Sequence, residues 1–179
     1  MLSALNVAKF FINLFKDQEE GITNLKLQKL LYYAQGFSFQ RFNKPLFPDE
    51  IEAWEYGPVI HRVYDFYKSY GREPIRNSEQ VRVNEDQERL LLDVAREYGK
   101  YTSTALVDMT HAKGTPWNKV YIEGEMHKII SKEQIKQHFI EHEEQLASFN
   151  IEDLLSKKEY KTVDKNTIIP LSEWDYEEI

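Results

Sequence analysis

The sequence contains no cysteine, little glycine or proline, and no long hydrophobic run. Without cysteine among its 179 residues, disulfides, thiolate zinc sites, iron–sulfur clusters and cysteine nucleophiles are excluded. Seven glycines and six prolines are too few for a collagen-like chain or a glycine-rich linker. No apolar run approaches the ~20 residues of a membrane-spanning helix, and the N-terminus lacks the features of a signal peptide. We therefore expect a cytoplasmic protein that does not enter a membrane.

Basic residues are outnumbered by acidic ones. Lysine and arginine total 23 against 30 aspartates and glutamates, which gives a net charge of −7. Because a non-specific nucleic-acid binder normally presents a basic face to the phosphates, we expect no nucleic-acid partner. The sequence also lacks a P-loop, a dinucleotide-binding glycine pattern and a G-x-S-x-G nucleophile motif, so the common signatures of those enzyme classes are missing.

Apolar and aromatic residues, in contrast, are plentiful. Hydrophobic residues make up 41% of the chain and aromatic residues 13%, which is too much for a disordered chain and enough for a sizeable core. The sequence predicts a mainly α fold, with a single compact domain of about six helices over residues 1–150 and at most a small β element. Composition then shifts, and residues 151–179 form an acidic C-terminal extension.

Helical periodicity and capping residues locate the expected elements. Apolar spacing predicts a helix over about 3–16, and Thr23 is a suitable N-cap for a second helix that stops near Asn43. The broad apolar face of the second helix predicts a central, well-covered position. Gly57-Pro58 predicts the start of a third helix, because proline is favoured at the first helical position.

Capping residues and helix-ending residues in the second half of the chain predict the remaining elements. A capping box at Asn84 and Gln87 predicts a helix that ends at Gly99, and a second capping box at Ser131 and Gln134 predicts one that runs to about Ser148. The other expected elements are a helix from Thr102 or Ser103 to Gly114, a strand within 50–56 and a short strand near Val81 and Val83.

One stretch matches a catalytic motif. His138 and His142, with Glu141 beside them, fit the H-x-x-E-H pattern of inverted zinc peptidases, in which two histidines one helical turn apart share a metal. A third ligand is needed and no distinctive one follows, so we expect no metal site and no cofactor. A zinc hydrolase on this motif is the least favoured hypothesis, and His61 and His111 are expected to be structural.

Three blocks of sequence, taken together, resemble a known family. The first is 23–36 (TNLKLQKLLYYAQG), the second is 53–59 (AWEYGPV) followed by Val63-Tyr64, and the third pairs Thr110-His111 with Pro116-Trp117. In this order and spacing they resemble the SocA-like Panacea domain, also called the GepA-like phage-associated family. The resemblance implies a mostly helical fold and a prophage-associated antitoxin of a toxin–antitoxin system.

The resemblance, which covers about residues 3–130, also implies a partner and a mechanism. The partner would be a cognate protein toxin that the antitoxin neutralises by direct protein–protein binding. An alternative is a proteolytic adaptor that delivers the toxin to a bacterial protease. The family supplies no catalytic residues, so we expect no enzyme, and the oligomeric state stays open.

Large aromatic side chains are the candidate partner contacts. Trp54, Tyr56 and Trp117 lie in the matched blocks, where a place in the core is favoured over direct contact with a partner. Trp174 and Tyr176 lie in the extension, whose last seven residues hold four acids and no base. Exposed aromatics of this kind anchor interfaces. The extension either binds the partner or packs as a strap on its own domain, and the sequence leaves both open.

Overall fold

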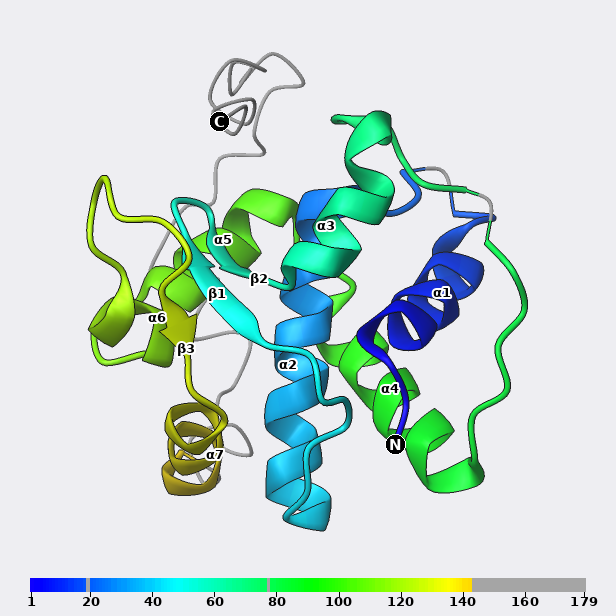
Figure 1. Ribbon diagram of the computed structural model, residues 1–179. Coiled ribbons are helices and arrows are strands. Elements are labelled where there is room, and N and C mark those ends of the chain that lie inside the picture. The colour runs from blue at the N-terminus through cyan, green and yellow to red at the C-terminus, as the bar shows by residue number, and fades with distance from the viewer. Residues whose placement is uncertain (19, 77, 143–179) are drawn as a thin grey trace. The chain divides into compact units, whose positions relative to one another are not determined.

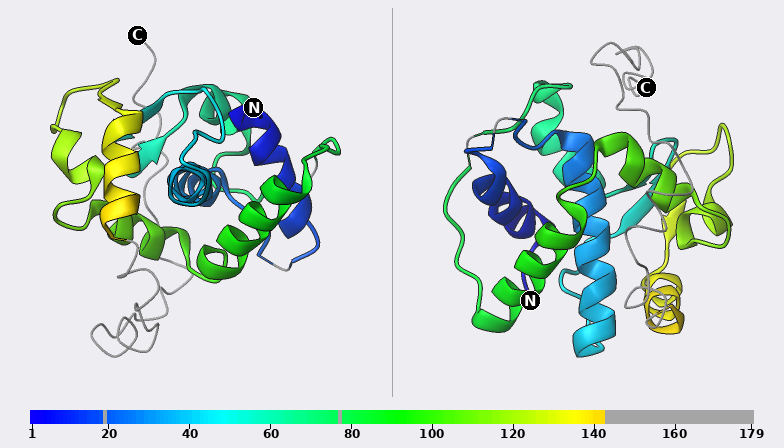
Figure 2. Two further views of the ribbon diagram at one scale, coloured as in Figure 1. Left: turned by 90° about the horizontal axis from the view of Figure 1, so that it is seen from below. Right: turned by 180° about the vertical axis from the view of Figure 1, so that it is seen from behind.

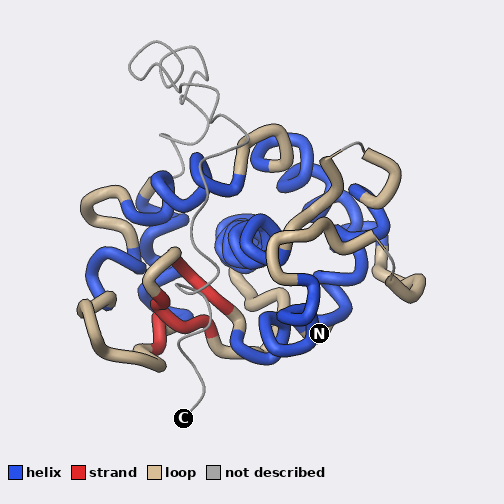
Figure 3. Tube along the Cα trace, turned by 90° about the horizontal axis from the view of Figure 1, so that it is seen from above, coloured by secondary structure: helices blue, strands red, loops and turns tan. Residues whose placement is uncertain are grey.

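Residues Met1–Glu141 fold around one long helix, α2 (Asn24–Phe42). In the computed structural model, which describes residues 1–18, 20–76 and 78–142, the unit Met1–Glu141 holds this helix at its centre. The left view of Figure 2 and Figure 3 show α2 end-on with the other described elements arranged around it. Thirteen of its 19 residues are buried, so the predicted central position of this helix is confirmed.

Local signals set both ends of α2. Thr23 Oγ1 accepts a hydrogen bond from the amide of Lys26 at 3.3 Å, which satisfies one of the free N–H groups of the first turn. At the other end Asn43 adopts the left-handed conformation and its amide donates to Phe39 O at 2.9 Å. The predicted cap and stop are both correct.

The surrounding helices follow in chain order (Figure 1). The amphipathic α1 buries one apolar face, and α4 begins with the predicted capping box, in which the Asn84 and Gln87 side chains each accept from the other residue's backbone amide. The mainly α prediction is confirmed. The bounds are α1 (Ala4–Phe15), α3 (His61–Tyr67) with a 3-10 turn η1 (Lys68–Tyr70), α4 (Glu85–Tyr98), α5 (Ser103–His111), α6 (Pro116–Val120) and α7 (Lys132–Glu141).

A small antiparallel sheet covers one side of α2. Its strands are β1 (Ile51–Trp54), β2 (Gly57–Val59) and β3 (Ile129–Ile130), in the order β2-β1-β3. The predicted strand within 50–56 is therefore confirmed. Neither β3 nor the short α6 was anticipated, and the expected strand near Val81 and Val83 is wrong, because these residues lie in a loop.

The prediction that Gly57-Pro58 starts a helix is also wrong. Both residues belong to β2, and α3 begins at His61. Gly57 has a φ of 102°, which suits the strand side of the tight turn after Trp54 and favours glycine. Pro58 lacks an amide donor, and a strand at the edge of the sheet tolerates that lack.

None of the helices within the described ranges combines the length and the apolar character needed to cross a membrane. The predicted extension of the last helix to Ser148 falls beyond residue 142 and so lies outside the described residues.

Candidate functional site

The three sequence blocks meet at the β1–β2 hairpin. Lys29 Nζ, from the first block, donates a hydrogen bond to Pro58 O in the second at 3.0 Å. Trp117 Nε1, from the third block, donates to Trp54 O in the second at 2.7 Å. Residues far apart in the sequence therefore hold one hairpin in place between α2 and the α5–α6 region (Figure 1).

Gly57 is the point around which these blocks pack. A Cβ at this position would lie 2.8 Å from both Lys29 Nζ and Thr110 Oγ1. Lys29 is fully buried, and burial holds the pKa of its amine well below the usual value. The glycine thus leaves room for a buried lysine that secures the hairpin to α2.

Trp117 lies in the core behind the hairpin. Its side chain is only 6% exposed and stacks on His111, with ring centroids 3.5 Å apart, and on Tyr121 at 4.5 Å. The pKa of His111 is lowered to about 4, chiefly by burial and also by the nearby Lys29 amine, while Asp108 opposes the shift. His111 is therefore neutral at pH 7, which fits the structural role expected from the sequence.

Trp54 and Tyr56 are placed differently, because both are half-buried. Burial alternates along β1, where Ile51 and Ala53 point to the core and Glu52 and Trp54 lie on the other face. Trp54 Nε1 donates to Glu52 Oε2 at 2.8 Å, which fixes the orientation of the indole. Tyr56 lies in the hairpin loop between β1 and β2.

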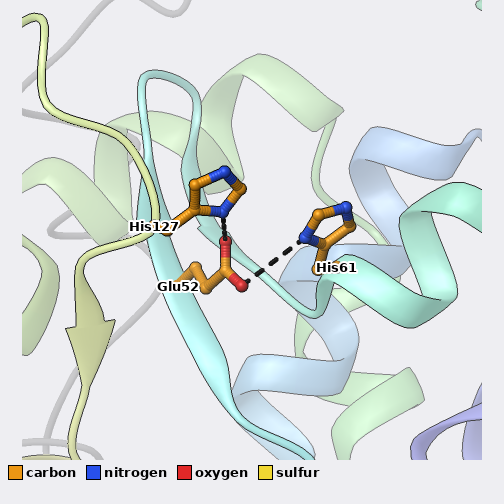
Figure 4. A group of neighbouring side chains, drawn as sticks. All are labelled: Glu52, His61 and His127. Carbon is orange, nitrogen blue, oxygen red and sulfur yellow. Dashed lines mark hydrogen bonds and ion pairs between the residues drawn. The ribbon is translucent and has the colours of Figure 1, made fainter. Parts of the chain in front are cut away.

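Glu52 also joins two histidines that the sequence did not connect. His127 Nδ1 lies 2.9 Å from Glu52 Oε2, and His61 Nδ1 lies 3.6 Å from Glu52 Oε1 (Figure 4). The two imidazole rings are nearly parallel, with centroids 5.4 Å apart. Since Glu52 and His127 are 75 positions apart, no local pattern could have linked them.

These residues define an outward surface that we call the hairpin face. Ile129 of β3 lies opposite Glu52 in the strand register, so both side chains project from the same side of the sheet. Ile129 is 48% exposed. The hairpin face comprises Glu52, Trp54, His61, His127 and Ile129.

The remaining sequence candidates lie elsewhere. His138 belongs to α7 and His142 follows the end of that helix. In the described ranges, the grouping of three potential metal ligands is Glu52, His61 and His127, and it includes neither of those histidines. Trp174 and Tyr176 lie outside the described residues.

The family model described as "Antitoxin SocA-like, Panacea domain" matches residues 27–118, just over half of the chain. The chain belongs to the SocA-like Panacea domain family. The matched segment includes Glu52, Trp54 and His61 and ends just after Trp117, whereas His127 lies beyond it.

A curated relative supports the same assignment. Antitoxin SocA of Caulobacter vibrioides (strain NA1000 / CB15N) is 32% identical over the aligned part, which covers 55% of this chain and 60% of the relative. The resemblance inferred from the three blocks is thereby confirmed at the level of the family. No solved structure matches this chain significantly.

Proposed function

We propose that this chain is an antitoxin that neutralises a protein toxin by binding it directly, with no catalytic step. The observation that carries the proposal is the family match over residues 27–118, joined by a curated relative named as an antitoxin. Because the match spans only part of each chain, it supports an antitoxin role in general. The binding of a protein toxin and its neutralisation by direct contact are what we propose.

We place the toxin-binding surface on the hairpin face and the adjoining Tyr56. Interfaces are anchored by large aromatic side chains held rigidly among polar neighbours, because a rigid side chain loses little entropy on binding. Trp54 meets this requirement: it is half-buried, its indole donates to Glu52, and its ring contacts His61 edge-on at 5.5 Å. Exposed Ile129, which lies opposite Glu52 in the strand register, adds apolar area to the same side of the sheet.

In this proposal Trp117 positions the hairpin face and does not itself contact the toxin. Its ring stacks on both His111 and Tyr121 and is only 6% exposed, and its indole N–H donates to Trp54 O. A side chain so enclosed has little surface to offer a partner. Its contribution would be to hold β1, and therefore Trp54, at a fixed position.

Co-expression tests the proposal. The gene next to the one encoding this chain is expressed from an inducible promoter, alone and together with this chain. We expect the neighbour to stop growth, this chain to restore it, and the two proteins to co-purify while the toxin stays abundant. Rescue without a complex at a normal toxin level would contradict direct binding and indicate an enzymatic antidote.

The same experiment distinguishes the proteolytic adaptor. If this chain lowers the toxin level, and if the level recovers when a bacterial protease is removed, the chain acts as an adaptor. Growth rescue would then depend on the protease, whereas a blocking antitoxin protects cells with or without it. Measuring toxin abundance beside growth therefore decides between the two mechanisms.

A further inference from the structure

Glu52, His61 and His127 gather three metal-ligating groups on the hairpin face. We infer that they bind one divalent transition-metal ion of the Zn²⁺ class, with a further coordination position open to water. The sequence led us to expect no metal, because its only candidates were His138 and His142. The inference stands on the geometry of this trio and does not rest on the proposed function.

The distances suit a shared ion. One ligand atom from each of the three residues lies within 4.8 Å of the other two, and the separations from the Glu52 carboxylate are 2.9 Å to His127 and 3.6 Å to His61. Ligand atoms held ~2.05 Å from a tetrahedral ion lie roughly 3.3 Å apart. The separation of 2.9 Å, to Glu52 Oε2, is shorter than that value, and the separation of 3.6 Å, to Glu52 Oε1, is slightly longer, so both carboxylate oxygens lie at distances close to those between ligands of one ion.

The neighbours of these side chains are those of a metal site. His61 Nε2, the ring nitrogen that faces away from Glu52, lies 3.2 Å from a carboxylate oxygen of Asp65. Glu52 Oε2 accepts from Trp54 Nε1 at 2.8 Å. In metal sites the second nitrogen of a ligating histidine commonly faces a carboxylate, and ligating carboxylates are themselves hydrogen-bonded. Both features orient the ligands before any ion arrives.

The backbone holds Glu52 and His61 firmly. Glu52 is paired on both sides, with Val59 of β2 and Ile129 of β3. The residue before His61 donates its amide to the buried Gln28 Oε1 at 2.9 Å, which fixes the start of α3. The separation of these two ligands is therefore set by the sheet and by α2.

His127 is held by the loop that leads into β3. Its φ is 60°, a left-handed conformation that is uncommon for a residue with a side chain. The next residue, Lys128, accepts a hydrogen bond at its carbonyl from Ala53 N at 2.7 Å. Such backbone strain persists only where the surroundings enforce it, and it gathers at functional sites. The imidazole of His127 points toward the Glu52 carboxylate (Figure 4).

The donor set selects the class of ion. Two imidazoles and one carboxylate suit Zn²⁺, Co²⁺ or Ni²⁺, whereas Mg²⁺ and Ca²⁺ prefer oxygen ligands throughout. Three protein ligands leave a coordination position for water, as in zinc sites that are not purely structural. Because Glu52 and Asp65 are both anionic, a dication would also meet compensating charge.

Zn²⁺ titration into the chelator-stripped full chain tests the inference. We expect one Zn²⁺ per chain by calorimetry and elemental analysis, a higher melting temperature with Zn²⁺, and no comparable effect of Mg²⁺. His61→Ala, His127→Ala and Glu52→Gln should each weaken Zn²⁺ binding by about 10- to 100-fold or more. His138→Ala is the matched control, because it removes a histidine outside the trio, and it should bind Zn²⁺ as the unaltered chain does.

Several results would overturn the inference. They are no saturable Zn²⁺ binding by the unaltered chain, unchanged binding after His61→Ala and His127→Ala are combined, or loss of binding with His138→Ala alone. Should a variant of the trio fail to fold, Co²⁺ absorption of the unaltered chain and of His138→Ala decides the matter. The intense d–d bands of four- or five-coordinate Co²⁺ support the site, and the weak spectrum of hydrated Co²⁺ excludes it.

Discussion

Lys29 Nζ donates a hydrogen bond to Pro58 O at 3.0 Å, from a side chain that is fully buried. A buried amine is costly unless it is paired, so this contact ties the centre of α2 to the strand β2. Pairing is possible because Gly57, the neighbour of Pro58, has no side chain to displace the lysine. The position of the hairpin face therefore depends on the absence of a Cβ atom at Gly57.

Replacing Gly57 by alanine should destabilise the fold. The new Cβ would lie 2.8 Å from Lys29 and Thr110, and the φ of 102° disfavours any side chain. We expect the free energy of unfolding to fall by roughly 2–4 kcal/mol, as strain and overpacking add. Gly124→Ala is the control, because φ is also positive there but no atom lies within 4 Å. Equal losses for the two variants in urea unfolding would show that the packing around Gly57 does not matter.

His111 should make stability depend on pH. Its pKa is about 4 in the folded chain, against 6.5 for an unperturbed histidine, so between these values the unfolded chain binds a proton that the folded chain does not. The free energy of unfolding is therefore unaffected by His111 above pH 6.5, and it decreases as the pH falls from 6.5 toward 4. We expect a loss on the order of 1 kcal/mol, since partial exposure weakens the effect.

His111→Phe provides the comparison for this pH dependence. Phenylalanine keeps a flat ring against Trp117 but cannot take up a proton, so the other titrating groups stay common to both proteins. Melting temperatures of both proteins between pH 7 and pH 4.5 measure the difference. If the variant loses as much stability on acidification as the unaltered chain, His111 is not the responsible group.

Trp54→Ala should weaken toxin binding while the domain stays folded. If the indole anchors the interface, the loss is about 2 kcal/mol or more, because such anchors carry most of the binding energy. Leu92→Ala is the control: Leu92 is 42% exposed on α4, which lies across α2 from β1 (Figure 2). Calorimetry with the co-expressed toxin gives both affinities. A Trp54→Ala variant that binds normally would remove the hairpin face from the proposal.

Deleting residues 171–179 tests the acidic extension. We predict weaker toxin binding with an unchanged melting temperature, and Trp174→Ala should reproduce most of that loss, on the order of 2 kcal/mol. Added salt should slow association if the acids steer a basic partner. Melting and affinity are measured on the same shortened chain. Unchanged affinity with a lower melting temperature would identify the extension as a strap on its own domain.

Features encoded within a few residues could be predicted from the sequence. The Asn84–Gln87 capping box joins positions three apart, and both of its hydrogen bonds are present. The Ser131–Gln134 pair behaves in the same way. The broad apolar face of the second helix likewise predicted a well-covered position, and Leu27, Leu30, Leu31 and Ala34 of α2 are all fully buried. Caps and apolar faces are local properties, so the sequence by itself determined most of the helices and the burial of α2.

Tertiary structure decided the hairpin and the site. Gly57-Pro58 satisfies the local rule for a helix start, yet pairing with β1 and the buried Lys29 make it a strand. The two-residue strand β3 exists only because β1 offers an edge for it to pair with. The sequence analysis did not group Glu52, His61 and His127, because their proximity also depends on contacts between distant parts of the chain. Sheet pairing and packing on α2 bring side chains from three separate segments within a few ångströms, and no spacing along the chain encodes that contact.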